Sequence, residues 1–282
     1  MSSDISLIPA QPQDYDDLSM FLSFEYFVHR HLDWRPSLDW LGKQPFWIAK
    51  VKDEIIGCFA AVPEPERYAW VRLFACSALY SRTAMWQEFF QRCLQQFGQK
   101  VETVGALGVE NWFIKLLDSS NFTVSQKIIV LEWNKGEIAP ISLSDSFHLR
   151  KMKPSDFEGV FSLDQKCFSP AWQLSLTSME NAFKQAGYAT IIETNQQIVG
   201  YQITTESLSS AHLARIAVDP DLQGKNLGKS ILNDLLLFYT HSGIHRFTVN
   251  TQNDNFKSQA LYHQAGFSET NESYPVYEYK IK

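Results

Sequence analysis

A weak internal repeat is the feature of this sequence that most limits its possible folds. The segment "DEIIGCFAAV" around Gly57 resembles "QQIVGYQITT" around Gly200, 143 residues later. Two further pairs keep nearly the same spacing, 142 and 145 residues, namely Pro12 with Pro154 and Phe122 with Phe267. Three anchors at almost constant spacing predict a unit of about 140 residues that occurs twice.

The second copy shows its strand and helix signals most clearly. Two β-rich runs surround the turn "TNQQ" in residues 188–207, which predicts a hairpin. The other expected elements are, in order, a strand at 212–218, a helix that ends near Gly243, a strand at 246–251, a helix at 255–266 and a strand at 276–281. Mixed elements in this order predict an α+β (α/β layered) fold for each copy.

The boundaries between the two copies follow from composition. The segment 139–146 lies in a stretch that contains Gly, Pro and several Ser residues, and we expect it to act as a linker. The sequence therefore predicts a first domain at 1–138 and a second at 147–282. A chain of 282 residues with 45% hydrophobic residues is long and apolar enough for two cores of ordinary size.

The charge distribution argues against nucleic acid as the main partner. The net charge is -6, and neither half has a cationic excess: residues 1–140 carry 13 Lys and Arg against 17 Asp and Glu, and residues 141–282 carry 12 against 14. No apolar run of 18 residues occurs, and the acidic N-terminus lacks the apolar core of a secretion signal. We expect no membrane association and a cytoplasmic location.

Neither a metal site nor a disulfide framework is predicted. The four cysteines lie far apart and form no C-x-x-C pair; they are Cys58, Cys76, Cys93 and Cys167. His29 and His31 form an H-x-H pair without a second group of ligands nearby. We therefore expect no bound metal, and a packed thiol rather than a nucleophile at Cys167.

One strand, loop and helix combination carries the main functional signal. In "ARIAVDPDLQGKNLGKSILNDLL", residues 214–236, an apolar strand is followed by a basic, glycine-containing loop and then by apolar residues at helical spacing. Gly224 and Gly228 allow backbone N–H groups to approach an anion at the start of the helix, and Lys225 and Lys229 add positive charge. A phosphate-binding loop is predicted, although a solvated lysine-bearing turn would give the same pattern.

A second pattern lies about 30 residues further along and supports the first. The loop reads Gln223-Gly224-Lys225-Asn226-Leu227-Gly228, which resembles the Q/R-x-x-G-x-G/A motif of the GNAT superfamily of N-acetyltransferases. Asn226 replaces the first glycine of that motif, and asparagine tolerates the left-handed backbone conformation better than most residues. The superfamily's later signature resembles the set Asn255, Ser258, Leu261, Tyr262, Gly266 and Phe267.

The resemblance covers residues 147–282 well and residues 4–135 only through the repeat. It implies two tandem GNAT-like domains, each with a mixed, mostly antiparallel sheet flanked by helices. It also implies acetyl-CoA as cosubstrate, with the pyrophosphate on the loop and the pantetheine arm along the preceding strand. The implied cosubstrate contacts are Ile216, Ala217, Val218, Gln223, Gly224, Lys225, Asn226, Leu227, Gly228, Lys229, Asn255, Ser258 and Tyr262.

The resemblance also suggests catalytic roles. A backbone N–H near Ile216 would polarise the acetyl carbonyl. Tyr262 would protonate the departing thiolate, or would only pack over the cosubstrate. Members that acetylate protein N-termini carry a glutamate at the position of Asn250, which cannot accept a proton from an ammonium group. Glu206, His212 or a relaying water molecule remains as the general base.

The first copy lacks the functional residues of the second. Its strand is followed by "ALYSRTAMWQEFF", which contains no glycine, and Leu117 stands where the second copy has Tyr262. We therefore expect one acetyl-CoA per chain and direct acetyl transfer to a primary amine of a small molecule or peptide. A CoA-binding sensor or scaffold without turnover is the alternative, and a tRNA-dependent aminoacyl transferase is disfavoured by the acidic charge. The sequence specifies neither the acceptor nor the oligomeric state.

Overall fold

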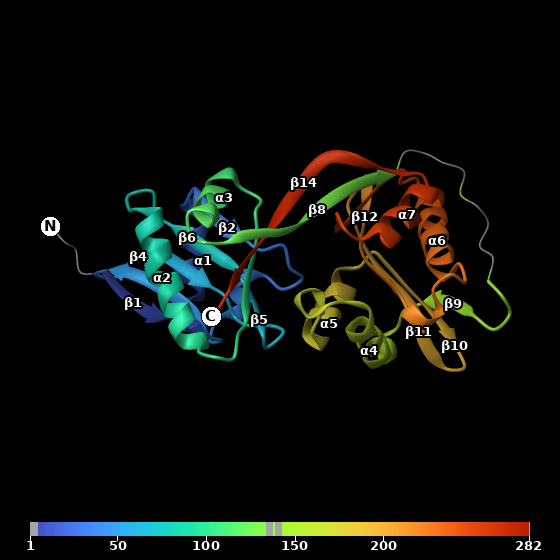
Figure 1. The fold of residues 1–282 in the computed structure, drawn as a ribbon, viewed down its shortest axis with the longest axis horizontal. Coiled ribbons are helices and arrows are strands. Elements are labelled where there is room, and N and C mark those ends of the chain that lie inside the picture. Colours follow the sequence, from blue (N-terminus) through green and yellow to red (C-terminus); the bar gives the residue numbers. More distant parts are fainter. Residues whose placement is uncertain (1–4, 134–137, 139–142, 282) are drawn as a thin grey trace. The chain divides into compact units, whose positions relative to one another are not determined.

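A computed structural model describes residues 5–133, 138 and 143–281 (Figure 1). The chain forms two compact units: the first unit comprises Met1–Gln126 and Tyr274–Lys282, and the second comprises Lys127–Ser273. Half of the expected linker, residues 139–142, lies outside the described residues. Within the described residues, no helix is long and apolar enough to cross a membrane, and no group of three or more potential metal ligands is found.

The first unit contains a five-stranded sheet, in the order β1-β3-β4-β6-β2, and a second set of strands around β7. The core between them is rich in aromatic side chains, because Phe59, Phe74 and Phe113 pack against Trp86. The elements of this unit are β1 (Ile5–Pro9), α1 (Tyr15–Phe24), β2 (Phe27–Arg30), β3 (Phe46–Val51), β4 (Glu54–Ala60), β5 (Tyr68–Trp70), β6 (Leu73–Cys76), α2 (Arg82–Phe97), β7 (Thr103–Leu107), α3 (Asn111–Asp118) and the start of β8 (Thr123–Trp133).

The second unit contains one sheet, in the order β14-β8-β13-β12-β11-β10-β9. The pair β12–β13 is parallel, whereas β9–β10, β10–β11, β11–β12 and β8–β13 are antiparallel. The mixed, mostly antiparallel sheet with flanking helices is therefore confirmed. The further elements are β9 (His148–Lys151), α4 (Phe157–Cys167), α5 (Leu176–Gln185), β10 (Tyr188–Thr194), β11 (Gln197–Glu206), β12 (Ser210–Val218), α6 (Leu227–His241), β13 (Arg246–Gln252), α7 (Phe256–Gln264) and β14 (Phe267–Lys280).

The expected hairpin is the β10–β11 pair. Thr194 is paired with Gln197, and the two residues between them, Asn195 and Gln196, have φ values of 48° and 63°. Positive φ at both central positions is typical of the tight turn whose twist matches that of the two strands. The hairpin brings β11 beside β12, the strand that leads into the predicted phosphate loop.

Each unit completes its strands with a segment from the other half of the sequence. Residues 128–132 of β8 pair with β13 in the second unit, and residues 276–280 of β14 pair with β7 in the first. The expected strand at 276–281 is thus the end of the 14-residue β14. Val276 and Tyr277 are buried in the first unit. The two compact units therefore differ from the expected domains, 1–138 and 147–282, in these two segments. The β8 residues belong to the second unit, and the end of β14 belongs to the first.

Candidate functional site

The candidate site begins where β12 and β13 separate. Only residues 210–213 of β12 pair with β13, and after Leu213–Val249 the two strands separate, while β13 stays paired with β8 on its other side. Beyond that point, β12 keeps β11 as its one strand partner in the described part of the chain. Residues 214–218, called the open edge of β12 from here on, therefore have no partner on one side among the described strands, although the Val218 carbonyl oxygen accepts a hydrogen bond from Cys167 Sγ at 3.5 Å.

A β-bulge marks the start of the open edge. Thr204 of β11 is paired with Leu213 and Ile203 with Arg215, so Ala214 is the extra residue. A bulge disrupts the local ladder and redirects the strand. As a result, Ile216 and Val218 face α6, where they pack against a small cluster that contains Ile231. Nothing in the residue types of this strand indicates a bulge, so it could not be predicted from the sequence.

The loop after β12 has the shape of an anion-binding helix start. Gly224 has a φ of 84° and Asn226 a φ of 61°, so Asn226 adopts the left-handed conformation that its glycine-like position requires. Asn226 precedes α6 but its side chain makes no capping hydrogen bond. The first amides of α6 therefore keep no acceptor within the helix, and such groups favour an anion.

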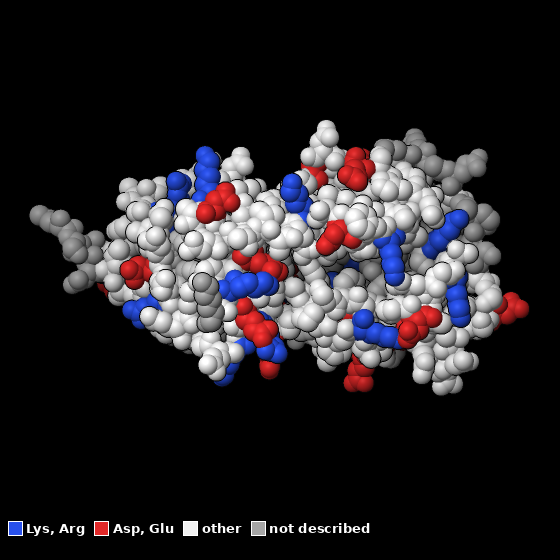
Figure 2. All heavy atoms as spheres, viewed as in Figure 1, with Lys and Arg blue, Asp and Glu red and all other residues white. Residues whose placement is uncertain are grey.

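Two exposed lysines, Lys225 and Lys229, add positive charge beside this helix start. Figure 2 shows Lys and Arg side chains gathered on the side of the second unit where Figure 1 shows α6. Loop and charge together suit a phosphate-bearing ligand.

The helix α7 supports the loop from one side. Asn255 caps α7 by accepting a hydrogen bond from the Ser258 amide at 3.2 Å, and Lys257 Nζ donates to Gln223 Oε1 at 3.1 Å. A Cβ atom at Gly228 would lie 3.3 Å from the Leu261 side chain. Gly228 therefore favours close packing of α6 against α7, and a larger residue there requires the Leu261 side chain to shift.

Tyr262 lies in the core between α7 and the sheet. It is buried, and its ring centroid lies 5.9 Å from that of Phe267. Burial raises the pKa of Tyr262, and a hydrogen bond with the Ser258 side chain lowers it in part. The phenol stays protonated at neutral pH, as a proton donor must, but the same environment also suits a packing role.

The two candidate bases lie on opposite faces of the sheet. His212 Nδ1 is 2.8 Å from Thr248 Oγ1, and burial lowers the pKa of His212, so the imidazole is neutral at physiological pH. Because side chains alternate along a strand, Asn250 shares the face of Thr248 and hence that of His212. Glu206 pairs with Ala211 and lies near Tyr239 of α6, on the other face.

A buried charge network beside the open edge was not foreseen from the sequence. Asp164 Oδ2 of α4 accepts hydrogen bonds from Arg215 Nε at 2.7 Å and from the Tyr201 hydroxyl at 2.5 Å. Arg215 Nη2 also donates to the Trp172 carbonyl oxygen at 2.7 Å, and the guanidinium lies 3.7 Å from the Phe168 ring centroid. One signal was available, namely a charged residue, Arg215, within an apolar strand. The network fixes the strand directly after the bulge.

The first unit closes the edge that the second unit leaves open. In the first unit, Gly57 of β4 pairs with Cys76 of β6; in the second unit, the equivalent Gly200 of β11 pairs with Val218 of β12. The end of β6 therefore corresponds to the open edge of β12. In the first unit, β2 pairs antiparallel with this edge of β6 from Phe27↔Cys76 to Arg30↔Leu73. The start of α2 also differs, because Ser81 Oγ accepts a hydrogen bond from the Ala84 amide at 3.3 Å.

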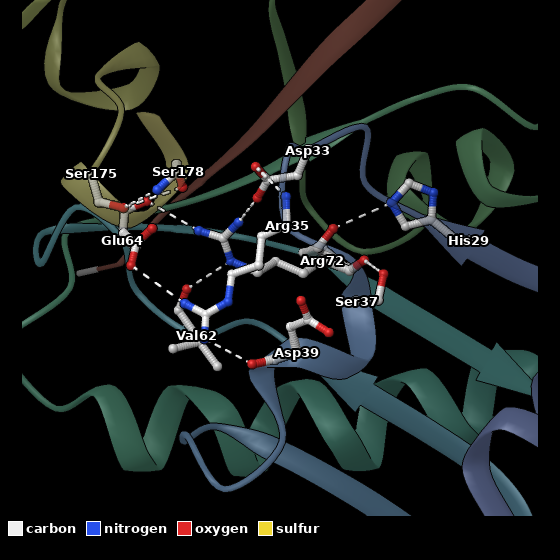
Figure 3. A network of polar contacts seen from close by, with 11 residues as sticks. His29, Asp33, Arg35, Ser37, Asp39, Val62, Glu64, Arg72, Ser175 and Ser178 are labelled. Carbon is white, nitrogen blue, oxygen red and sulfur yellow. Dashed lines mark hydrogen bonds and ion pairs between the residues drawn. The ribbon is translucent and has the colours of Figure 1, made fainter. Parts of the chain in front are cut away.

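A polar network anchors β2 and the segment after it. Arg72 is buried; it forms an ion pair with Asp33 and donates to the carbonyl oxygens of Val62 and Glu64, each at 3.2 Å (Figure 3). His29 of β2 is also buried, with Nδ1 3.3 Å from Glu110 Oε2 and its ring stacked on Phe113. The strand that covers the edge is thus held through His29, and the segment directly after it through Asp33.

Comparison with known proteins identifies relatives of the second unit and of the whole fold. Residues 157–267 match the Acetyltransferase (GNAT) family. The [ribosomal protein bS18]-alanine N-acetyltransferase of Haemophilus influenzae is 27% identical over 121 residues, which cover 43% of this chain and 81% of that protein. Its Escherichia coli K12 counterpart is 23% identical over 121 residues, 43% of this chain and 80% of that protein.

Several solved structures resemble almost the whole chain, among them the following two. A tandem GNAT protein from the clavulanic acid biosynthesis pathway has a TM-score of 0.63 at 12% identity and covers 99% of both chains. A probable N-acyltransferase from Enterococcus faecalis has a TM-score of 0.72 at 9% identity and covers 98% of this chain and 73% of that one. These likenesses show the fold of a tandem GNAT protein.

Proposed function

We propose that the second unit, in which residues 157–267 match the Acetyltransferase (GNAT) family, transfers an acetyl group from acetyl-CoA directly to a primary amine. One observation carries the proposal: the open edge of β12 leads into an uncapped helix start flanked by two lysines. An extended, amide-bearing chain that ends in phosphates matches both parts. The paired edge and capped helix of the first unit match neither.

The residues present fit the cosubstrate in chemical terms. Acetyl-CoA supplies an acetyl thioester, a pantetheine arm with two amides and a pyrophosphate. The arm lies along Ile216, Ala217 and Val218 and hydrogen-bonds those main-chain groups that face the open edge, as an added strand would. The amides from Gln223 to Gly228 bind the pyrophosphate, with Lys225 and Lys229 supplying charge. An amide between the bulge and Ile216 polarises the acetyl carbonyl.

His212 is the base that the geometry favours. It stands one residue before the last β12–β13 pair, and its lowered pKa keeps it able to accept a proton from an ammonium group. The hydrogen bond to Thr248 fixes the ring. Glu206 faces α6 instead, and a relaying water is the remaining alternative. Tyr262 donates a proton to the departing thiolate.

The acceptor is a primary amine on a small molecule or a peptide. The bS18-alanine acetyltransferases are relatives at 27% identity or less, and the glutamate implied for N-terminal acetylation is replaced here by Asn250. That replacement favours one second candidate, a CoA-binding sensor or scaffold without turnover. Release of CoA thiol across a panel of amines, with N-terminal alanine peptides included, separates the two candidates.

The loop assignment is tested by two variants that differ in charge alone. Gly228→Glu and Gly228→Gln place the same volume against Leu261, but only the glutamate brings a negative charge to the helix start. We expect calorimetry to show acetyl-CoA binding at least tenfold weaker for Gly228→Glu than for Gly228→Gln. Equal affinities in the two variants would mean that the pyrophosphate binds elsewhere.

A further inference from the structure

The first unit contains a cavity that the proposed acetyl transfer does not use. It has a volume of about 750 Å³ and lies between β2, the start of α2 and the helix α3. Ligand pockets for small molecules commonly measure about 300–1,000 Å³. In the repeat, α2 and α3 correspond to α6 and α7 of the second unit.

The side chains that line the cavity carry a net positive charge. Arg82 and Lys115 both line it, and neither forms an ion pair with any residue that the structure describes. Glu110 also lines it, with its carboxylate 3.3 Å from His29 Nδ1, so the lining carries two positive side chains and one negative side chain. An anionic group on a ligand would meet the two cations as donors of charge-assisted hydrogen bonds.

The walls of the cavity are aromatic. Phe27 and Trp112 meet edge to face, with ring centroids 5.6 Å apart, and the Arg82 guanidinium lies 3.7 Å from the centroid of the Phe27 ring. Tyr26 also lines the cavity, and its side chain is 81% exposed. Such surfaces bind planar rings by stacking and edge contacts, and a ring over an arginine adds a cation–π contribution.

The cavity does not suit acetyl-CoA in the pose proposed for the second unit. The edge that would receive a pantetheine arm is paired with β2, and β2 is itself held by buried His29. The cavity can therefore accept a compact ligand but not an extended chain along the sheet.

We propose that this cavity binds a compact anion that carries an aromatic ring, with the anionic group on Arg82 and Lys115 and the ring against Phe27 and Trp112. The site belongs to the first unit and does not depend on the acetyl-transfer proposal. The two cations can bind either a phosphate or a carboxylate. The experiment below determines which of the two anionic groups the cavity prefers.

Calorimetry of the full chain, with acetyl-CoA at saturation, tests the proposal. The probes are phenyl phosphate and phenylacetate, with inorganic phosphate and benzyl alcohol as the charge-only and ring-only comparisons. We expect one of the two aromatic anions to bind at a single site, at least tenfold more tightly than either comparison, and the preferred one identifies the anionic group. Absence of saturable binding by both aromatic anions up to millimolar concentration would overturn the proposal.

Variants locate the binding. The double variant Arg82→Gln/Lys115→Gln removes both cations, and Lys100→Gln is a control at an exposed lysine that does not line the cavity. Loss of charge-assisted hydrogen bonds should weaken the preferred probe by about ten- to a hundredfold in the double variant only. Unchanged affinity there, with the thermal midpoint of the parent, would place the probe elsewhere and refute the site.

Discussion

Asn226 shows at the scale of one residue how the motif tolerates a substitution. The family motif has glycine there because the backbone must turn left-handed before the helix, and Asn226 reaches a φ of 61° without it. Its side chain leaves the helix start uncapped. The substitution therefore keeps both the loop shape and the free amides. A single residue that differs from the motif is for this reason compatible with anion binding.

His212 should determine the acidic limb of the pH profile. Burial lowers its pKa from 6.5, so the neutral form that accepts a proton persists below pH 6.5 and is lost as the pH falls through the lowered value. We expect kcat/KM to rise with an apparent pKa below 6.5. His212→Gln should lower kcat/KM by about 10²–10⁴-fold and remove this limb.

The control for that prediction is His245→Gln, because His245 is exposed and lies on the turn before β13. It should leave the profile unchanged. If the acidic limb survives in His212→Gln, the base is Glu206 or water.

Tyr262→Phe removes one buried hydroxyl and keeps the ring. If the phenol protonates the departing thiolate, kcat should fall by about 10²-fold or more while the affinity for acetyl-CoA stays close to that of the parent. Tyr239→Phe is the matched control, since Tyr239 is equally buried in the same core but packs at the end of α6. Equal kcat values for the two variants, with chemistry limiting turnover, would reduce Tyr262 to a packing role.

At the scale of elements, the two units differ most at one strand edge. The edge of β12 from Ala214 to Val218 is open, and the aligned edge of β6 is covered by β2. A free edge pairs readily with any extended chain that offers amides. The same duplicated strand is thus available to a ligand in one unit and used for folding in the other.

The network around Asp164 should stabilise α4 against β11 and β12. Asp164 is fully buried and paired with Arg215, and removal of one partner from a buried ion pair leaves an uncompensated charge. We expect Asp164→Ala to cost about 3–5 kcal/mol of stability. Because the chain has two units, hydrogen exchange of the β11 amides is the measurement, since it reports the second unit alone.

An exposed ion pair of the same unit serves as the control. Glu132→Ala breaks the pair with Arg246 on the surface, and such pairs contribute at most about 1 kcal/mol. If the exchange rates of Asp164→Ala match those of Glu132→Ala, the buried network does not stabilise the strand.

At the scale of the whole molecule, duplication alone would suggest two acetyl-CoA sites, whereas we predict one. The first unit lacks the loop glycines, has Leu117 in place of the tyrosine and covers its strand edge with β2. Calorimetry of the intact chain should give a stoichiometry of one, and Gly228→Glu should weaken that binding at least tenfold. Two sites in the parent, only one of which is weakened by Gly228→Glu, would show that the first unit also binds acetyl-CoA.

Acetyl-CoA should be titrated into the intact chain and not into separate halves, because each unit contains a strand segment from the other half of the sequence. A fragment of residues 1–138 would lack residues 276–280, which pair with β7, and a fragment of residues 147–282 would lack residues 128–132, which pair with β13. Each fragment would expose an unpaired strand. Loss of binding in a fragment would then report misfolding instead of a missing site.

The sequence by itself determined those features that depend on neighbours along the chain. Strand and helix periodicity predicted the hairpin, the strand at 212–218 and the helix after it, and the spacing of Gly57 and Gly200 predicted the duplication. The phosphate loop could be predicted for the same reason, because glycines, lysines and the following helix lie within seven residues of one another.

The tertiary structure alone decided which strand edges are filled. The pairing of β2 with β6, the bulge at Ala214, the Asp164–Arg215 pair and the two exchanged segments all join residues far apart in sequence. A strand edge carries the same N–H and C=O groups whatever its sequence, so its partner is selected by the packing and the free edges of the folded chain. For that reason two similar copies in one sequence fold into one unit with an open edge and one with a closed edge.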